Sequence, residues 1–489
     1  MTDSKQGNYS IKSVLIIIIW ISSTLNVFGQ AKKPEPDQKY PADSLRQWTS
    51  GLMDEISRKH PGFYRYTEKG KFGLLIDSTQ QSIQDSLTQL QYYRKLKPLF
   101  AKIGCLHTGI ELPEESKTYL NSNNLIPLEL FVEAKTHKVL VSKNYSDKKN
   151  IQIGGEVVSI NGAPISVILN KLLAAIPSDG YNQTEKILLL NYRFPFWYQE
   201  IIDAPKVFKV VVRSENTEQT FDLNGASKDV FPPLEKLEKN YGSPLEFEVK
   251  DGIAILKIHS FADTAIKRGG QNFKKFVKDV FQTLQQQNIK DLIIDVRNNT
   301  GGTDDNAALL ASFFFDKTFR YWDKIEVTEA VAKEIKGVNK MFYKKPEENN
   351  GLYLWKKSWI TKEFDYYEPQ EPAKMNFKGN SYLLTNGLCL SSCADFTAVM
   401  SYNKKAVVIG QETGGGYQGN TSGMLSKATI PTGLVITIPL QKYTNAVDLN
   451  KNFGRGTIPD DEIATTFENW IGNKDLELDY TIQLINKNN

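Results

Sequence analysis

Two serines stand between two cysteines in "CLSSC", Cys389 to Cys393, and this stretch is the first place in the chain where chemistry is expected. It follows the apolar run "SYLL" and leads into the helical pattern "CADFTAVMSY". A serine at the N-terminus of a helix lies at the positive end of the helix dipole, which favours an oxyanion formed nearby. The spacing has a second explanation, because Ser392 followed by Asp395 also resembles a capping box that needs no catalysis.

A glycine pair marks a second candidate loop, "RNNTGGT", which follows the apolar strand pattern Leu292–Val296. Gly301 and Gly302 permit backbone conformations that aim N–H groups into a site. In a sheet built from crossovers, ligands bind at the C-terminal ends of the strands. Both loops follow predicted strands, so together they favour acyl transfer.

A serine nucleophile needs a base, and the chain has only 4 histidines. His60 precedes a proline in a polar bend, His137 lies in a predicted hairpin turn, and His259 lies in a predicted strand. His107 follows a predicted helix and lies in a loop-like place, from which its side chain can project towards a distant partner. Elimination therefore selects His107, although a histidine in a loop is more often structural than catalytic.

The elements that must position these residues change in character along the chain. From Ser44 to about Phe100 the pattern is helical, and Ile83, Leu87 and Leu90 repeat at helical spacing. "GGEVVSING" then predicts a strand over Glu156–Ile160, followed by an Asn-Gly turn and a helix. This strand–turn–helix order resembles the middle of a PDZ domain, but "PSDGYNQTEK" and the residues after it have no place in a minimal one.

Strand and helix patterns alternate from about Leu245 onwards, which predicts crossovers and a mostly parallel sheet in an α/β fold. The predicted division of the chain is a signal peptide at 1–30, a linker at 31–43, a helical region at 44–120, a PDZ-like domain at 121–215 and a core domain at 225–489.

Composition excludes several classes of function. A net charge of +4 with interleaved acidic and basic residues gives no basic stripe for nucleic acid. No histidine pair has ligand spacing and the 3 cysteines follow no zinc pattern, so no metal or other cofactor is expected. The apolar run Val14–Ile21 is too short to span a bilayer and predicts export, hence a secreted or periplasmic protein with no membrane attachment after cleavage. The alternative for this segment is an uncleaved membrane anchor. Nothing in the sequence specifies an oligomeric state.

Several motifs together resemble the C-terminal-processing (tail-specific) serine peptidases. "DVRNNTGG" resembles their Asp-x-Arg-x-Asn-x-Gly-Gly stretch, "SSCADF" their nucleophile helix, "VVIGQETGGG" their Gly-Glu-Thr-like turn and "GRGTIPD" their closing Gly-x-x-Pro-Asp element. "LHTGIEL" is similar to the His-Thr element of the tricorn-like, His-using branch. The motifs keep the family's order from about Leu45 to Ile485.

The resemblance implies a ClpP/crotonase-like core with a modified PDZ-like domain, acting on a peptide or protein substrate. It makes Ser392 the nucleophile, with Ser391 as the fallback, and His107 the base. The oxyanion hole would use the backbone N–H of Cys393 beside Gly301 or Gly302.

The sequence also departs from the family pattern. The processing branch carries a catalytic lysine in a Phe-Gly-Lys-Gly turn, where this chain has "GGGYQG". In the His-using branch an acid positions the histidine, and the matching place here holds Phe453. Glu412 is the substitute candidate for this third member of the relay. If His107 meets Ser392, Cys105 comes near the other two cysteines, and a disulfide from Cys105 to Cys389 or Cys393 is expected.

Two rival functions stay open at this stage. The missing lysine and the missing acid favour a protein that kept the fold, lost catalysis and binds peptides or proteins. A thiol peptidase that uses Cys393 or Cys389 is the third reading of the same segment.

Overall fold

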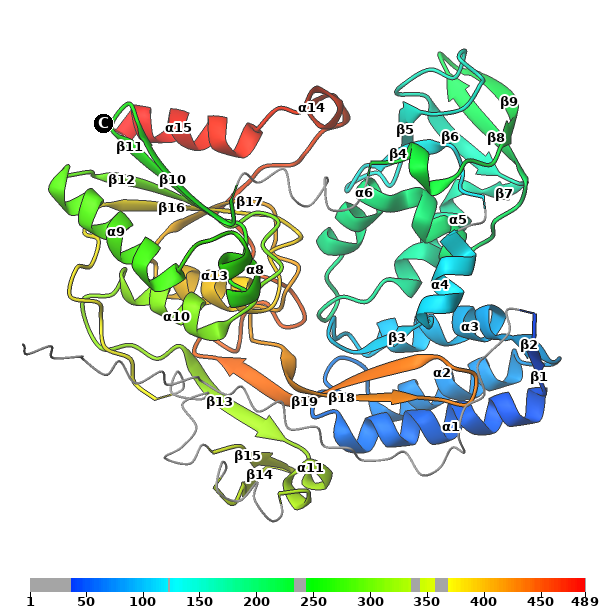
Figure 1. Ribbon diagram of the computed structural model, residues 1–489, viewed down its shortest axis with the longest axis horizontal. Helices are drawn as coiled ribbons and strands as arrows, with labels where there is room; N and C mark the ends of the chain where they lie inside the picture. The colour runs from blue at the N-terminus through cyan, green and yellow to red at the C-terminus, as the bar shows by residue number, and fades with distance from the viewer. Residues whose placement is uncertain (1–36, 122–123, 233–242, 336–343, 357–367, 489) are drawn as a thin grey trace, which may run out of the picture.

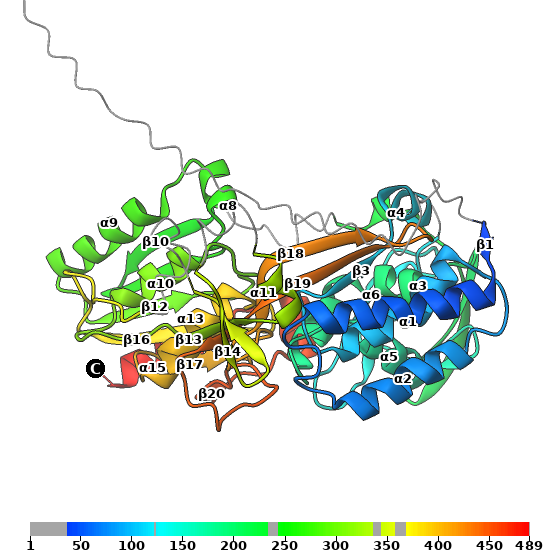
Figure 2. The same cartoon turned by 90° about the horizontal axis from the view of Figure 1, so that it is seen from below.

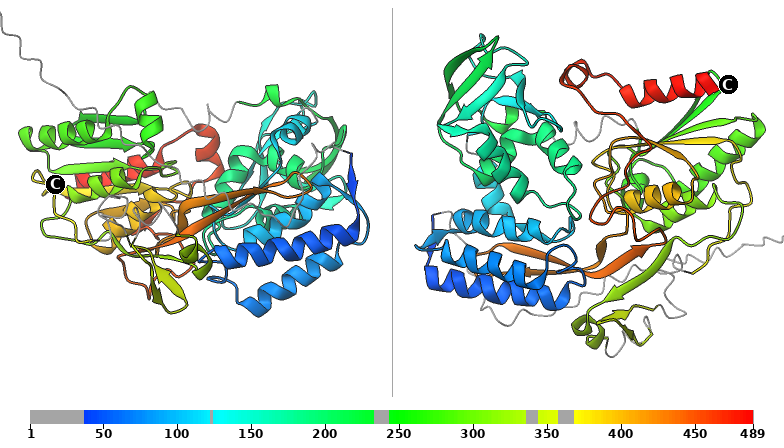
Figure 3. Two further views of the ribbon diagram at one scale, coloured as in Figure 1. Left: turned by 60° about the horizontal axis from the view of Figure 1, so that its bottom comes forward. Right: turned by 180° about the vertical axis from the view of Figure 1, so that it is seen from behind.

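The computed structural model describes residues 37–121, 124–232, 243–335, 344–356 and 368–488. These form a helical region (37–121), a middle region (124–232) and a core region (243–488). Figure 3 shows the core and middle regions side by side, with the blue helices of the helical region beneath the middle region. The predicted signal peptide lies outside the described residues. Among the described helices, none has the length and apolar character needed to cross a bilayer.

The helical region consists of α1 (Ala42–Lys59), α2 (Lys69–Gln81) and α3 (Gln89–Lys102), with β1 (Lys39–Tyr40) paired antiparallel to β2 (Leu87–Thr88). The helical spacing around Ile83 and Leu87 does not produce a helix there. Instead α3 begins at Gln89, because Thr88 and Gln91 form a reciprocal capping box. The short helix α4 (Glu114–Asn121) ends the region.

The middle region is an antiparallel sheet with two helices packed against it. The sheet order is β4-β5-β6-β8-β9, with β7 paired to β6. Its strands are β4 (Leu128–Val132), β5 (Val139–Asn144), β6 (Glu156–Ile160), β7 (Ala163–Pro164), β8 (Val207–Ser214) and β9 (Thr217–Asn224). The helices α5 (Ile165–Ala175) and α6 (Thr184–Ile201) complete a separate hydrophobic core.

The expected strand, turn and helix are present around Asn161, whose φ of 52° and that of Gly162 at 79° make the tight turn. The sheet extends to Asn224, beyond the residue 215 at which the sequence placed the domain boundary. The residues without a place in a minimal PDZ domain form the loop before α6 and α6 itself.

The core region contains a sheet of order β10-β11-β12-β16-β17-β20, in which every neighbouring pair except β10 with β11 is parallel. Its strands are β10 (Leu245–Lys250), β11 (Ile253–Ile258), β12 (Asp291–Asp295), β16 (Asn380–Thr385), β17 (Val407–Gly410) and β20 (Asp461–Glu462). The predicted crossovers and mostly parallel sheet are therefore confirmed.

Helices cover both faces of this sheet (Figure 1). One face packs against α9 (Phe273–Gln286), α10 (Asp304–Ser312) and α13 (Ser392–Tyr402), and the other against α15 (Leu476–Asn488). The small helices are α8 (Asp263–Arg268), α11 (Glu329–Lys333) and α14 (Phe467–Gly472).

A third sheet connects the core region to the helical region. Its order is β14-β15-β13-β19-β18, with strands β13 (Trp322–Val327), β14 (Glu347–Asn349), β15 (Leu352–Leu354), β18 (Thr421–Thr429) and β19 (Val435–Asn445). The far end of β19 also pairs with β3 (Gly109–Glu111), which directly follows the His107 loop. Figure 2 shows β18 and β19 reaching from the core region to the helices. This pairing fixes the His107 segment against the core region.

Candidate active site

Ser392 is the first residue of α13, at the carboxyl end of β16. Its side chain is 1% exposed, and its Oγ makes no hydrogen bond within the described part of the chain. The residue before it, Ser391, has φ 51° and ψ −129°, a strained conformation for a residue with a side chain, and it makes no side-chain cap bond. Capping therefore does not explain this serine pair, because neither hydroxyl caps the helix.

The loop after β12 holds in place the loop between β16 and α13, residues 386–391, which is called the nucleophile loop below. Asn299 accepts the N–H of Leu390 at its backbone oxygen (3.1 Å), and its side-chain amide donates to the carbonyl of Ile258 (2.8 Å). Gly301 has φ 97°, and a Cβ there would stand 2.8 Å from the Leu390 carbonyl oxygen and 3.1 Å from the Ser392 nitrogen. Only glycine fits this close approach between the two predicted loops.

The arginine of the "DVRNNTGG" motif supports the fold instead of facing the nucleophile. Arg297 bonds Asp295 on its own loop and reaches Asp475 (2.6 Å) and Glu477 (3.2 Å) at the start of α15. This network ties the carboxyl end of β12 to the helix on the opposite face of the sheet.

Two of the three predicted oxyanion donors already make hydrogen bonds in this structure. The N–H of Cys393 donates to the Leu390 carbonyl (3.0 Å), and the N–H of Gly301 donates to Asn299 Oδ1 (2.9 Å). By contrast, the N–H groups of Gly302 and Ser392 make no hydrogen bond to any other described residue. These two amides are free to bind an anion, while the other two would first have to break a bond.

His107 lies in the loop between α3 and β3, half-buried, and the backbone of Thr421 near its ring raises its pKa. A neutral imidazole carries one proton, and its second nitrogen can only accept. Nδ1 has no partner among the described residues, as expected for that acceptor. Burial lowers the pKa of His107 while the charge of Asp179 opposes this, so the ring is neutral at pH 7 and able to take a proton.

Packing brings the His107 loop to the nucleophile loop. Leu106 packs against a small cluster formed by Leu188, Leu388 and Leu390. On the other side, the backbone of Thr421 lies near the His107 ring while its neighbour Asn420 bonds Asp395 of α13. The His107 loop therefore lies against the segment that leads into α13, and neither Ser392 Oγ nor His107 Nδ1 makes a hydrogen bond within the described residues.

Asp179 is the acidic residue that the sequence reasoning missed. It is 3% exposed and lies in the loop between α5 and α6. Its Oδ1 accepts the N–H of Leu106 and its Oδ2 the N–H of Gly416, both at 3.1 Å, so it bridges the two loops. Burial raises its pKa, and the His107 charge opposes that rise. The one sequence signal was the loop "PSDGYNQ", which a minimal PDZ domain lacks.

Glu412, the predicted third member of the relay, makes other contacts. Its carboxylate accepts from Arg455 Nε (2.9 Å) and from the N–H of Gly456 (2.8 Å). Thr413 of the same turn exchanges hydrogen bonds with Thr457. Glu412 thus joins the turn after β17 to the closing element, and the acid that bears on the pKa of His107 is Asp179.

His60 does not lie in a polar bend, as the sequence suggested, because it is 2% exposed. Its Nδ1 accepts the N–H of Gly62 (3.0 Å), so its Nε2 carries the proton and donates to Thr108 Oγ1 (2.8 Å). Burial lowers the pKa of His60 to about 3. His60 is therefore a neutral structural neighbour of the His107 loop.

The expected disulfide from Cys105 is wrong, because Cys389 and Cys393 are bonded to each other. Cys105 is the free cysteine, buried, with its Sγ donating to the Thr421 carbonyl (3.3 Å). Burial raises the pKa of the Cys105 thiol to about 12. A bonded cysteine has no thiolate to attack with, so this structure argues against the thiol-peptidase reading.

Asp395 is a second buried acid, in the first turn of α13. It is 2% exposed and accepts hydrogen bonds from the side-chain amides of Asn420 (3.2 Å) and Asn445 (3.0 Å). Burial raises its pKa to about 7, against these hydrogen bonds. Asp395 joins the nucleophile helix to the ends of β18 and β19.

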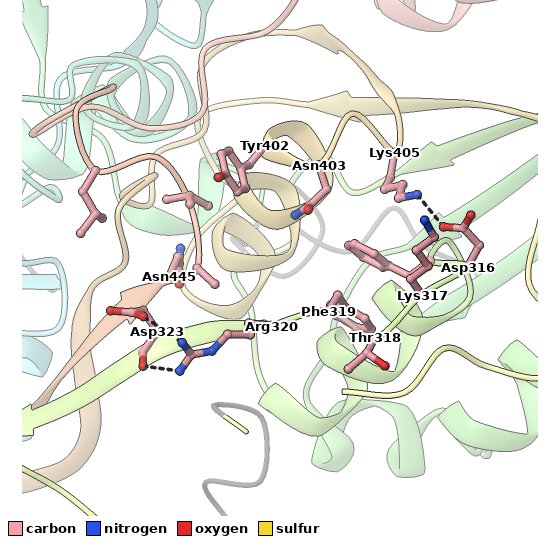
Figure 4. Close-up of a pocket in the computed structure, with 14 residues that line it drawn as sticks. Asp316, Lys317, Thr318, Phe319, Arg320, Asp323, Tyr402, Asn403, Lys405 and Asn445 are labelled. Carbon is pink, nitrogen blue, oxygen red and sulfur yellow. Dashed lines mark hydrogen bonds and ion pairs between the residues drawn. The ribbon is translucent and has the colours of Figure 1, made fainter. Parts of the chain in front are cut away.

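Lys404 and Lys405 lie at the far end of α13 from Ser392, about 16 Å away for a helix of 11 residues. Figure 4 shows that end, where Lys405 pairs with Asp316 (3.5 Å) and Arg320 with Asp323 (3.4 Å) around a cavity of about 530 Å³. As the sequence suggested, neither lysine is placed to act on Ser392.

Known proteins share both the motifs and the fold. Residues 252–463 match the model of "Peptidase family S41". Proteins named "Probable CtpA-like serine protease" from Staphylococcus aureus strains bovine RF122 / ET3-1 and COL are each 29% identical to this chain over 128 residues. That alignment covers 26% of this chain and 24% of each relative, so the chain matches about a quarter of their length.

Two solved structures share the architecture over nearly the whole chain. One is described as "Structure of mature CPAF complexed with lactacystin", with a TM-score of 0.63, 13% identity, and coverage of 91% of this chain and 97% of that chain. The other, "Crystal Structure of mature CPAF", has a TM-score of 0.60, 15% identity, and coverage of 91% and 98%. At these identities the likeness shows a shared fold. Motifs, family match and fold agree in the core region, where residues 252–463 are similar to peptidase family S41 and so support a C-terminal-processing serine peptidase.

Proposed function

We propose that the protein is a serine peptidase that hydrolyses peptide bonds in peptide or protein substrates. The observation that carries the proposal is the pairing of two unsatisfied groups at one place. A buried serine hydroxyl without a partner stands at a helix N-terminus, and a neutral histidine with an unprotonated Nδ1 lies in the loop packed against it. Most buried polar groups make a hydrogen bond, so two unpartnered groups on adjoining loops, one a hydroxyl and one an imidazole nitrogen, support a chemical role.

The chemistry runs through an acyl-enzyme. Ser392 Oγ attacks the peptide carbonyl carbon while His107 Nδ1 accepts the hydroxyl proton. The free N–H groups of Gly302 and Ser392 donate to the oxyanion, each contributing about 3 kcal/mol to the transition state. His107 then protonates the leaving amine. A water molecule, deprotonated by the same nitrogen, hydrolyses the ester and restores Ser392.

Asp179 acts as a positioning residue for the base. Its carboxylate fixes the backbone of Leu106, next to His107, and favours the imidazolium that forms during the reaction. Glu412 keeps the neighbouring turn attached to the closing element, and its predicted relay role passes to Asp179.

We also propose that the parallel sheet of the core region is of the ClpP/crotonase kind and that the middle region is a modified PDZ domain. The crossover sheet supports the first assignment, and the strand–turn–helix around Asn161 supports the second. Export to the periplasm or the medium rests on the apolar segment Val14–Ile21 in the sequence.

A serine-reactive fluorophosphonate of small size tests the proposal. We expect it to label the wild-type protein and the Ser391→Ala variant, and to leave Ser392→Ala unlabelled. Ser391→Ala is the matched control, because it removes the adjacent hydroxyl and leaves the predicted nucleophile in place. Peptide mapping of the adduct identifies the labelled residue.

The alternative is a peptidase-fold protein that binds peptides without cleaving them. The missing hydrogen bond between Ser392 and His107 favours it. Failure of the wild-type protein to react with the phosphonate, combined with saturable peptide binding, would establish this alternative.

A further inference from the structure

A cavity of about 640 Å³ lies between the middle region and the core region. Its size falls within the range of about 300–1,000 Å³ that is typical of ligand sites. Its walls come from the end of β4, from α6, from the closing element and from α14. The lining residues used below are Phe131, Ile187, Leu188, Glu412, Arg455, Ile458 and Trp470.

The cavity continues the proposed active site. Leu188 lines the cavity and also packs against Leu388 and Leu390 of the nucleophile loop. Glu412 lines it too and begins the turn in which Gly415 donates its N–H to the Cys389 carbonyl (3.1 Å). A peptide bound with its carbonyl at Ser392 therefore has this cavity beside it.

The charged groups of the cavity balance one another. Arg455 is paired with Glu412, and the remaining lining charges are one lysine, Lys135, and one acid, Glu462. No excess positive charge is present to attract a C-terminal carboxylate.

Backbone recognition at the edge of β4 is also blocked where the cavity meets it. The side-chain amide of Asn191, on α6, bonds both the N–H (2.7 Å) and the carbonyl (3.4 Å) of Val132. An added peptide strand would have to displace that amide.

Apolar side chains form one part of the cavity wall, beside polar ones such as Gln183, Gln411 and Thr465. Phe131 and Trp470 are in ring contact at 5.6 Å, and Ile187 and Leu188 face them from α6. Ile458 is 45% exposed although it is a large apolar side chain. An apolar ligand group would remove such surface from water.

From the position, the balanced charge and the apolar walls, we infer that this cavity is a specificity site for a large apolar side chain of the substrate peptide. It selects an internal leucine- or phenylalanine-like residue and does not select a free C-terminus. The inference rests on the proposed peptidase function.

The test begins with a peptide library, in which mass spectrometry of the products locates the preferred apolar position. Matched fluorogenic peptides with Leu, Phe or Asp at that position then give kcat/KM. Ile458→Glu should lower kcat/KM for the Leu and Phe peptides about 10- to 100-fold. The conservative variant Ile458→Leu should keep kcat/KM near the wild-type value. The matched control is Leu425→Glu, an equally exposed apolar residue on β18 outside the cavity lining, which should change kcat/KM less than about twofold.

A second variant enlarges the site from the other wall. Trp470→Ala should shift the preference from Leu towards Phe, because a larger side chain then fills the space. A library without an apolar preference, unchanged kcat/KM in Ile458→Glu, or tight binding that requires a free carboxylate would overturn the inference.

The small phosphonate separates this failure from failure of the proposed function. Because it carries no peptide, it should label Ile458→Glu as fast as the wild-type protein. Normal labelling of Ile458→Glu together with unchanged peptide selectivity would contradict the specificity site but not the peptidase function. Absence of labelling in the wild-type protein would contradict both proposals.

Discussion

The nucleophile segment and the base segment of the site are built in opposite ways. Ser392 stands in one continuous stretch of strand, strained turn and helix, and its neighbours Asp395 and Cys393 lie in the same helix. The base side is assembled from pieces: His107 follows α3, Asp179 lies between α5 and α6, and Thr421 begins β18. The nucleophile is therefore a local structure, whereas the base depends on three regions meeting correctly.

Removing the reactive side chain from each of the two segments is the strongest test of this comparison. Ser392→Ala and His107→Ala should each lower kcat by roughly 10⁴- to 10⁶-fold, and the double variant should be little worse, because the two act as a unit. Peptide-hydrolysis kinetics measure the effect, with thermal unfolding as the control for folding. Additive losses in the double variant would show that the two residues act independently.

The next largest effect concerns the nucleophile side alone. Because burial raises the pKa of Asp395 from 3.8 to about 7, this acid prefers to be protonated in the folded protein. Its stabilising contribution is complete below about pH 4 and is lost as pH rises through about 7, a loss of up to about 4 kcal/mol.

Asp395→Asn should abolish this part of the pH dependence, since an amide does not ionise. Denaturant unfolding of both proteins at pH 5 and pH 8 measures it, with Asp229→Asn, an exposed acid, as the control. An equal fall in stability between the two pH values in wild type and Asp395→Asn would contradict the raised pKa.

The predicted effect of changing Asp179, in the base segment, is smaller. Asp179→Asn should lower kcat/KM about 10²-fold, because the imidazolium loses its charge partner. It should also move the acid limb of the pH profile to lower pH, since the Asp179 charge raises the pKa of His107.

Glu412→Gln is the matched control for Asp179→Asn. It breaks the ion pair with Arg455, so kcat should change by about threefold or less, and a change in KM reports the cavity that Glu412 lines. A larger loss in Glu412→Gln than in Asp179→Asn would return the relay role to Glu412.

The smallest expected effect is that of the disulfide beside the nucleophile. The Cys389–Cys393 bond spans a sequence separation of only 4, for which the chain-entropy model gives about 2 kcal/mol of stability. Cys389→Ser should lose that amount, measured by denaturant unfolding, while Cys105→Ser should keep it until a reductant is added. Three reactive thiols in the denatured, non-reduced wild-type protein would show that the bond is absent.

The sequence by itself determined the features that depend on local or strongly periodic patterns. The alternating strands and helices predicted the parallel core sheet, and motif order indicated the family and selected Ser392 and the paired glycines as the candidate site. The Asn161 turn was also readable, because few residues tolerate its left-handed backbone. The predicted helix around Ile83 is wrong, because the four-residue capping box Thr88–Gln91 starts α3 after the first part of the apolar pattern.

Only the tertiary structure decided which groups from distant segments meet. Asp179 has no sequence signature, since its role comes from one loop bridging Leu106 and Gly416. Glu412 follows β17 in the family's motif but binds Arg455, and Cys393 is bonded to Cys389 and not to Cys105. The sequence also could not predict which backbone N–H groups stay free to bind an oxyanion. Nearly every residue has a backbone N–H, and only the fold decides which acceptor lies opposite it.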